Sequence, residues 1–360
     1  MPRRSIPTSS ASPGLASGTS AWTDRPPVTA DVPCTYPAGS FGELAGNITG
    51  LLATQKSNTT SFSLESDSAP EFYVTGNPAN DAPAVRALER DVSGLTASNP
   101  YTGTTQPITN YLADPTEQAI LHMVNADPAR TPTFAMFAKP DYFLTPGSAT
   151  CGPCVTQNTA FAYNHGDYAA EINTNFFGIA GPGVRHLGVD GTAAADGPNS
   201  AGPDSGQVTV PGSGTTGTWI DETDIRPTLI YLTGLKDDYE HDGRVITQIL
   251  ASPNRALRSP GVPALGACYK QLNSSVGIFG TDTLIAATGA IESSSPGDAT
   301  YLQADHALRK LDLARDALAG RIKGELEAAA FGNVPVHGAG GQLLGCDALL
   351  HKAHDVASSG

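Results

Sequence analysis

The sequence predicts an α/β protein with a mixed sheet flanked by helices, followed by a helical C-terminal region. Three observations support this fold class. Three apolar runs of strand length lie between Thr133 and Val184, each ending in a polar or glycine-rich tip. Segments with helical 3/4 spacing of apolar residues precede these runs. A long apolar stripe of helical period extends from Tyr301 to Phe331.

The chain divides into three parts by composition. Residues 1–38 are rich in Ser, Thr, Pro, Gly and Ala without periodicity, so we expect them to be disordered. Residues 39–255 contain the strand-like runs and are expected to form the α/β domain. Residues 256–360 are expected to form a helical hairpin or small bundle.

Several elements are expected before the apolar runs. Phe41 to Ala53 has a weak helical spacing, and Glu71 to Thr75 has the composition of a short strand. A helix should open at 81–83, where Asp81 could cap it and a proline follows in the first turn. A second helix is expected from about Asp114 to Asn125.

Polar residues follow two of the three apolar runs. Asp141 ends the first, and Asn164, His165, Gly166 and Asp167 end the second. The glycine lets the backbone turn sharply, so the imidazole can project from the sheet edge. Carboxylate and imidazole groups are ligands that zinc accepts. We therefore expect Asp141, His165 and Asp167 to bind a divalent metal, zinc; alternatively, Asp141 and Asn164 cap turns while His165 bonds a carbonyl group.

Cys151 and Cys154 form a CxxC motif flanked by turn-forming residues. A thioredoxin-type motif opens a helix after a strand, and a zinc site needs a second ligand pair that no other CxxC or HxxxH supplies. We expect a local disulfide that closes a hairpin tip, with free thiols as the alternative. A disulfide indicates an oxidising compartment, so we expect a secreted or extracytoplasmic protein, although no signal peptide is present at this N-terminus.

The segments after the apolar runs alternate between polar and helical. A polar stretch from about Gly188 to Thr218 could be functional or disordered. A helix follows, with Thr223 or Asp224 as its cap and Leu229, Ile230 and Leu232 buried. Near the C-terminus, His351 and His354 could share a metal, but surface histidines are the simpler interpretation.

The chain is acidic, with 35 Asp and Glu against 21 Lys and Arg and a net charge of −14. Such a surface repels nucleic acid and anionic lipid, so we expect no nucleic-acid partner. No apolar run reaches the roughly 20 residues of a membrane helix, so we expect no membrane span. The sequence also lacks the motifs of a nucleophile elbow, a phosphate-binding loop and a dinucleotide site.

Four segments occur in order along the chain: TFAMFAKPD, NHGD, FFGIAGPGV and DETDIRPTLIYLTGL. This order resembles the C-terminal half of the alkaline-phosphatase-like superfamily, which includes phosphatases, phosphodiesterases, nucleotide pyrophosphatases and sulfatases. The chain is more closely similar to a group of secreted bacterial members, which share the KDDYEHDGRV turn and a helical tail. The resemblance covers roughly residues 40–330, and its ordered set of motifs is more specific than any single one.

The resemblance implies particular metal ligands. In that superfamily a strand ends in an Asp-His pair, and a later His precedes a strand that ends in a Gly-Pro turn. Asp141 matches the Asp of the pair, with Tyr142 at the second place, and His165 matches the later His. In an alternative alignment Asn164 and His165 are themselves the pair. Both alignments retain His165 and alter one other ligand, and Glu222 stands where relatives have His.

The resemblance also implies a partial alkaline-phosphatase-like sheet and metal-dependent hydrolysis of a small phosphate or sulfate ester. The superfamily has an N-terminal strand that ends in a metal-binding Asp, followed by a Ser or Thr nucleophile, and residues 1–40 contain no such segment. We therefore expect a fragment or a degenerate protein that does not turn over substrate alone. The alternative is a secreted, non-catalytic binding or surface protein with the same scaffold.

Overall fold

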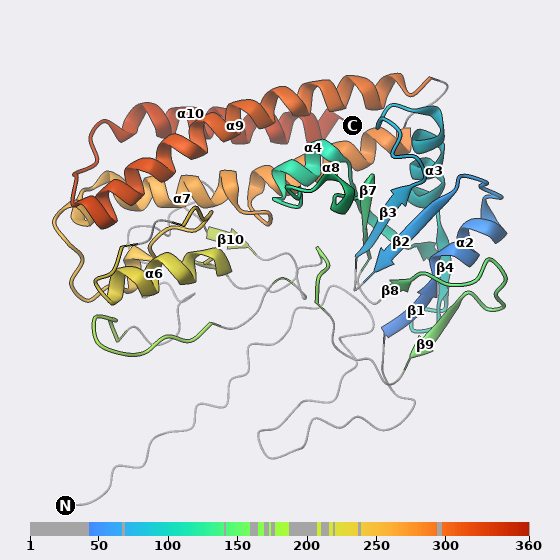
Figure 1. The fold of residues 1–360 in the computed structure, drawn as a ribbon, viewed down its shortest axis with the longest axis horizontal. Helices are drawn as coiled ribbons and strands as arrows, with labels where there is room; N and C mark the ends of the chain where they lie inside the picture. The colour runs from blue at the N-terminus through green and yellow to red at the C-terminus, as the bar shows by residue number, and fades with distance from the viewer. Residues whose placement is uncertain are drawn as a thin grey trace, which may run out of the picture.

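A computed structural model describes residues 43–66, 69–139, 142–158, 165–168, 173, 177–186, 207–209, 216–218, 220–236, 239–293 and 297–359. Over these residues the chain is a mixed α/β protein with small sheets and several helices, which confirms the predicted class at this level. Most of the strands lie at one end of the molecule, and long helices extend from them to the other end (Figure 1).

One antiparallel sheet has four strands in the order β2, β3, β7, β6. Their bounds are β2 (Phe62–Ser66), β3 (Pro70–Val74), β7 (Phe134–Ala138) and β6 (Thr109–Ala113). The Phe72 and Phe134 rings stack across β3 and β7 with centroids 4.4 Å apart. Paired aromatic rings on neighbouring strands stabilise a sheet beyond their burial alone. The strand predicted from the EFYVT segment is confirmed as β3.

A second sheet has three strands in the order β8, β1, β9. Their bounds are β8 (Tyr142–Thr145), β1 (Glu43–Asn47) and β9 (Val155–Asn158). The helix predicted from Phe41 to Ala53 is therefore wrong at its start, since pairing with β8 and β9 outweighs a weak local helical pattern. A Cβ on Gly46 would lie 2.5 Å from Leu144, so the glycine admits the close approach of β8.

Helix α2 (Ile48–Gln55) begins after Asn47, whose side chain accepts a 2.9 Å hydrogen bond from the backbone N–H of Gly50. The predicted disulfide between Cys151 and Cys154 is present and closes the loop between β8 and β9. A separate two-stranded sheet pairs β4 (Thr96–Asn99) with β5 (Thr104–Pro107).

Helix α3 (Pro83–Ser93) confirms the first predicted helix, with Val85, Leu88 and Val92 buried. The predicted cap at Asp81 is wrong, because the N-cap position is Ala82 and no side chain caps the helix there. The proline at the first helical position lacks an N–H group, which removes one of the donors that a cap would satisfy.

Helix α4 (Pro115–Ile120) starts where predicted but ends five residues early. Its start has a capping box, in which the Glu117 carboxylate accepts a 3.2 Å hydrogen bond from the backbone N–H of Asp114. Two residues after its end, His122 has a left-handed backbone with φ of +59°. A tertiary contact of His122, described below, ends the helix before the predicted Asn125.

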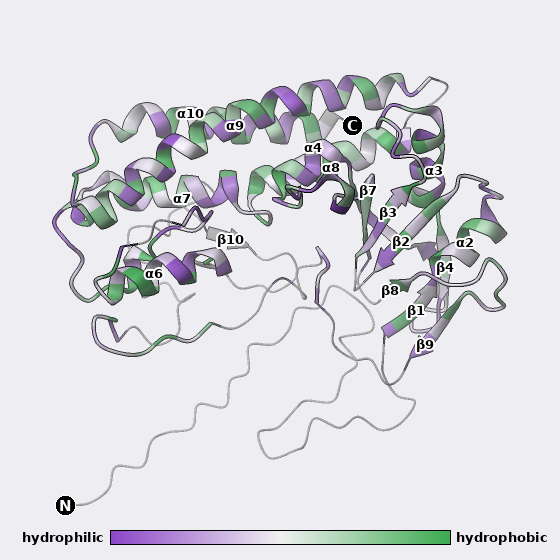
Figure 2. Ribbon diagram, viewed as in Figure 1, coloured by the Kyte–Doolittle hydropathy of each residue, from purple (hydrophilic) through white to green (hydrophobic). Residues whose placement is uncertain are grey.

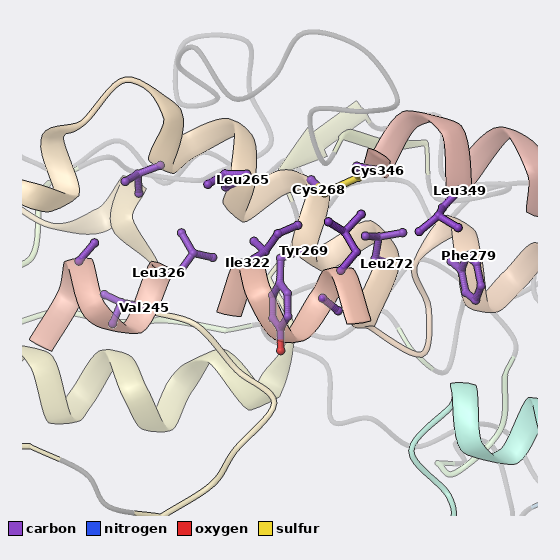
Figure 3. Packing of buried hydrophobic residues seen from close by; sticks show 14 of the residues in the cluster. Val245, Leu265, Cys268, Tyr269, Leu272, Phe279, Ile322, Leu326, Cys346 and Leu349 are labelled. Atoms are coloured by element: carbon purple, nitrogen blue, oxygen red, sulfur yellow. A yellow bond between two sulfur atoms is a disulfide. The ribbon is translucent and has the colours of Figure 1, made fainter. Parts of the chain in front are cut away.

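The C-terminal third is helical, as predicted. It comprises α7 (Gly261–Asn273), α8 (Ile278–Ser293), α9 (Ala299–Gly332) and α10 (Ala339–Ser359). A second disulfide, which the sequence did not predict, joins Cys268 in α7 to Cys346 in α10 (Figure 3). Beside it, Leu272, Ile322 and Leu349 from three helices pack into one core (Figure 3). Hydrophilic and hydrophobic residues alternate along α9, as its 3/4 stripe predicts (Figure 2).

Helix α8 packs the helical region directly against the four-stranded sheet. Leu284 is buried with Ala135 and Phe137 of β7. The Thr288 hydroxyl accepts a 2.9 Å hydrogen bond from the backbone N–H of Leu112 in β6. These contacts make the sheet and the helices share a continuous interior where they meet.

The helix predicted after the polar stretch begins as a 3-10 turn, η4 (Glu222–Asp224), and continues as α6 (Ile225–Leu232). Its cap is Asp221 rather than Thr223 or Asp224, because the Asp221 side chain accepts from the backbone N–H of Thr223. The predicted burial of Leu229 is wrong: its side chain is 48% exposed, while Pro227 and Thr228 face the interior. Three further 3-10 turns are η1 (Pro128–Arg130), η5 (Thr247–Ile249) and η6 (Ala256–Arg258).

The third predicted strand, from Phe176 to Ala180, is wrong over its described part. Residues 177–180 have no strand structure, and their side chains are exposed or half-buried. Backbone pairing starts only at Val184, which bridges to Leu250. Within the polar stretch, β10 (Gln207–Thr209) pairs with β11 (Thr216–Thr218). The apolar run before His165 lies outside the described residues.

Candidate functional site

The predicted ligands His165 and Asp167 lie on either side of Gly166, whose left-handed backbone (φ +74°) reverses the chain. The His165 side chain is exposed, whereas Asp167 is only 6% exposed. The Asp167 carboxylate accepts a 2.5 Å hydrogen bond from the backbone N–H of Tyr168, and its carbonyl accepts from the Asn173 side chain at 2.8 Å. The third predicted ligand, Asp141, lies outside the described residues.

Tyr168 holds this turn against the body of the protein. Its ring makes an edge contact with Tyr111 at 5.6 Å and a tilted contact with Phe137 at 5.5 Å. Its hydroxyl donates to the backbone carbonyl of Ser275 and lies 3.0 Å from the Thr281 hydroxyl. Burial raises the pKa of Tyr168 well above its ordinary value, so the phenol keeps the proton that it donates.

The anchor of Tyr168 lies at the carboxyl end of β7. Phe137 is the fourth residue of that strand and precedes Asp141 by four positions. On either side of Asp141, the backbone N–H of Tyr142 donates to the carbonyl of Lys139 at 3.2 Å. Phe137, near the end of β7, thus contacts Tyr168, the residue that follows Asp167.

The segment Asp221–Asp224 meets the same junction from a distant part of the sequence. Asp221 accepts from the backbone N–H and hydroxyl of Thr223 through one oxygen, at 3.0 and 2.8 Å. Its other oxygen accepts a 2.5 Å hydrogen bond from the Ser274 hydroxyl. Ser274 and Ser275 lie in the connection between α7 and α8, so this connection contacts both Asp221 and Tyr168.

Asp224 is a buried anchor for the turn that follows α6. It is 2% exposed and accepts a 2.8 Å hydrogen bond from the backbone N–H of Arg244. Burial raises the pKa of Asp224, and the positive charges of Arg244 and Lys270 oppose this shift. A Cβ on Gly243 would lie 1.9 Å from the carbonyl oxygen of Thr223, so the two segments approach this closely only with glycine.

A cavity of about 190 Å³ lies between these segments and α7. We name it the Asp221 cavity, and its charged and amide-bearing lining residues are Asp221, Asp224, Asp242, His122, Lys270 and Asn273. Ser275 also lines it, which places the cavity beside the carbonyl that binds Tyr168. The cavity and the His165 turn are therefore neighbours.

His122 lines the cavity in its left-handed conformation. Its Nε2 lies 2.8 Å from the carbonyl oxygen of Asn273, near the end of α7. A carbonyl only accepts hydrogen bonds, so Nε2 carries a proton and donates it to this carbonyl. The ring Nδ1 lies 3.8 Å from a carboxylate oxygen of Asp242. The bond to Asn273 satisfies a carbonyl that the helix end leaves unpaired.

Sequence reasoning did not single out His122, Asp221 or Asp242, because they meet only through tertiary packing. The local signal nearest to them is the KDDYEHDGRV turn, which contains Asp242 and the required Gly243. The Glu222 side chain is exposed. The two C-terminal histidines are mainly exposed: His351 lies 2.8 Å from the Asp347 carbonyl of its own helix, and His354 lies 3.5 Å from Asp282.

The donor set of the His165 turn suits zinc, since an imidazole and a carboxylate lie two residues apart around a sharp reversal. Among the residues that the structure describes, no three His, Cys, Asp or Glu side chains come together as a metal site, and Asp141 is outside that set. No described helix is long and apolar enough to cross a membrane.

No protein-family model, curated protein or solved structure matches this chain.

Proposed function

We propose that this chain is the metal-binding part of a phosphate or sulfate ester hydrolase of alkaline-phosphatase-like type. Asp141, His165 and Asp167 are the proposed ligands of a divalent metal, zinc. The proposal rests on the ordered set of sequence segments that resembles the superfamily, and one structural observation carries it further.

That observation is the convergence of two segments on the connection between α7 and α8. Tyr168, next to Asp167, donates to the carbonyl of Ser275, and Asp221 accepts from the hydroxyl of the adjacent Ser274. Both segments belong to the ordered set that resembles the superfamily, and they lie more than 50 residues apart in the sequence. Segments that build one site must meet in space, so this convergence supports the proposal.

The residues of this chain would hold the metal and position it. His165 is exposed and offers its imidazole to an ion at the surface of the turn, while Tyr168 fixes the backbone that carries both proposed ligands. A bound zinc ion would act as a Lewis acid that polarises a phosphoryl or sulfuryl oxygen. The two disulfides support a secreted or extracytoplasmic location, because disulfides persist in oxidising compartments.

Metal analysis of the purified chain tests the proposal. We expect stoichiometric zinc after dialysis against zinc and then metal-free buffer, and loss of that zinc in His165→Ala. The matched control is His337→Ala, which removes an exposed histidine between α9 and α10 and should retain the metal. A wild-type chain without bound zinc, or a His165→Ala variant that keeps it, would refute the proposal.

An activity assay tests whether this chain alone hydrolyses phosphate esters. No segment of this sequence resembles the superfamily strand with its Ser or Thr nucleophile, so we expect no hydrolysis of 4-nitrophenyl phosphate or bis(4-nitrophenyl) phosphate by this chain alone. Clear turnover would contradict that expectation. The second candidate function is a secreted, non-catalytic binding protein, and the Asp221 cavity favours it if zinc is absent.

A further inference from the structure

Three side chains at the contact between α8 and α10 have the order of a Ser–His–Asp triad. The Nδ1 atom of His354, in α10, lies 3.5 Å from the Oδ2 atom of Asp282, in α8. On the opposite side of the same ring, Nε2 lies 3.5 Å from the hydroxyl oxygen of Ser358. A histidine with a carboxylate at one ring nitrogen and a hydroxyl at the other is placed to take the hydroxyl proton.

Asp282 distinguishes this arrangement from a simple pair on one helix. A serine and a histidine four residues apart meet routinely on a helix surface, but Asp282 belongs to a different helix and is only 9% exposed. Among the described residues, its buried Oδ2 atom accepts no hydrogen bond of standard geometry. An N–H group at Nδ1 of His354 is a donor within reach of this oxygen, and such bonds often shorten only when substrate binds.

The charge of Asp282 and the His354 ring also influence each other. Burial raises the pKa of Asp282, and the facing ring opposes that shift. A carboxylate accepts hydrogen bonds and does not donate them, so it favours the ring form that carries a proton on Nδ1. In the neutral ring the lone pair is then on Nε2, the atom that faces the Ser358 hydroxyl.

Packing holds the turn of α10 that carries the pair. The end of α10 lies beside α8 (Figure 1), where Ala357 packs against a cluster that includes Ala286. Ala353 is fully buried in the core of the helical region. These two alanines each precede a member of the pair by one position, so their contacts place His354 and Ser358 at the rim of the α8–α10 interface.

The rim is open to a substrate. The His354 side chain is 68% exposed and Ser358 is exposed, so an ester in solution can reach the hydroxyl. Ile285 lies one helical turn after Asp282 and is also exposed. It offers an apolar surface on α8 for a small acyl group.

We propose that Ser358 is a nucleophile toward activated carboxylic esters, with His354 as its general base and Asp282 as the residue that orients the ring. The serine oxygen bonds to the ester carbonyl carbon while its proton moves to Nε2 of the neutral ring. The bond from that carbon to the alcohol oxygen then breaks, and the alcohol leaves with the proton from Nε2. Water attacks the acyl-serine by the same route, which yields the carboxylic acid and restores the hydroxyl.

The position of Ser358 inside a helix limits its substrates. Its backbone N–H lies in the last turn of α10 and, as in any α-helix, bonds the carbonyl four residues earlier, so it does not serve an oxyanion. Loss of one oxyanion donor slows a serine hydrolase by about 100- to 1000-fold. We therefore expect reaction with aryl esters, which have good leaving groups, and none with amides.

The test is acetylation of the full oxidised chain by 4-nitrophenyl acetate in buffer with EDTA, which excludes metal-dependent hydrolysis. The release of 4-nitrophenol gives the rate, and peptide mass spectrometry identifies the acetylated residue. We expect an acetyl group on Ser358, formed at a rate that rises over the range, about pH 6 to 7, in which imidazole groups become neutral. None of the three residues is a proposed zinc ligand, so failure here leaves the metal proposal untouched.

Three variants separate the roles. Ser358→Ala should remove the acetylated site, and His354→Gln should slow acetylation of Ser358 by about 100-fold, the usual contribution of a general base. Asp282→Asn should slow it by about tenfold and move the pH profile to lower pH, because a facing carboxylate favours the protonated ring. A merely structural role of Asp282 would not move that profile.

Two controls match these variants. Ser293→Ala removes an exposed serine at the end of α8 whose hydroxyl donates to the Ala290 carbonyl, and His337→Ala removes an exposed histidine. Both should leave the rate and the acetylated position unchanged. Absence of an acetyl group on Ser358, equal acetylation of Ser293, or an unchanged rate in His354→Gln would overturn the proposal. So would an Asp282→Asn variant with the wild-type rate and pH profile.

Discussion

The buried charges around Arg86 should make the stability of this fold decrease as pH rises. Arg86 lies 2.5 Å from a Glu89 carboxylate oxygen and 3.3 Å from one of Asp114, and each of these side chains is at most 2% exposed. Glu117 is buried beside Asp114. Burial raises the pKa of both Glu89 and Glu117 well above 4.5, and the charge of Asp114 raises each further. Arg86 opposes the shift of Glu89 without cancelling it.

The sign of the pH dependence follows from these directions. A carboxyl group whose pKa is higher in the folded state holds its proton more tightly there. Its contribution to stability is complete below the unfolded pKa, near 4.5, and is lost as pH rises through the folded pKa. Within that window each group lowers the free energy of unfolding by about 1.36 kcal/mol per pH unit, so the two together lower it by about 2.7 kcal/mol per unit where both titrate.

The variant Glu89→Gln isolates one of the two groups. It removes the proton equilibrium but keeps the side-chain shape, so the slope of unfolding free energy against pH above 4.5 should fall by about 1.36 kcal/mol per unit. Urea unfolding followed by circular dichroism at pH 5, 6, 7 and 8 measures that slope. Glu65→Gln, exposed on β2, should leave it unchanged. A Glu89→Gln slope equal to that of the wild type, or a wild-type stability that rises with pH, would refute the reasoning.

Two further predictions concern covalent and steric constraints. The Cys268–Cys346 disulfide spans 78 residues, so replacing both cysteines by Ser should cost up to about 4.5 kcal/mol from loop entropy, measured by urea unfolding against the wild type in oxidising buffer; equal stability would contradict this. Gly243→Ala should lower the free energy of unfolding by about 3 kcal/mol, because the new Cβ would meet the Thr223 carbonyl oxygen. The control Gly320→Ala, in α9 with no atom near the new Cβ, should raise it by about 0.5–1 kcal/mol, and urea unfolding measures both variants.

Local sequence patterns were sufficient to predict those helices and turns in which tertiary packing agrees with the intrinsic preference of the residues. Helix α3 was predicted from a proline start and one apolar face, and the C-terminal helices from a long stripe of 3/4 period. The Cys151–Cys154 disulfide was predictable because the two cysteines are three residues apart. In each case the decisive contacts lie within a few turns or residues of the sequence.

Tertiary contacts decided the elements that were predicted wrongly. Residues 43–47 form β1 because β8 and β9 flank them, and α4 ends early because His122 bonds the carbonyl of Asn273, 151 residues away. The candidate site shows the same division. Gly166 and the ligand types around it were visible in the sequence, whereas the Asp221 cavity combines residues from positions 122, 221, 242 and 270, which no local pattern connects.

The disulfide to Cys346 also affects how the last helix opens. Terminal helices usually fray, since few contacts hold their ends. Here Cys346, in the first half of α10, is bonded to α7, so the residues before it cannot separate from the core while the bond is intact. Native-state opening of α10 in the oxidised chain should therefore begin from Asp347 onward, and amide exchange around Cys346 should approach the rate set by global unfolding. Reduction would convert the whole helix into a segment that exchanges by local opening.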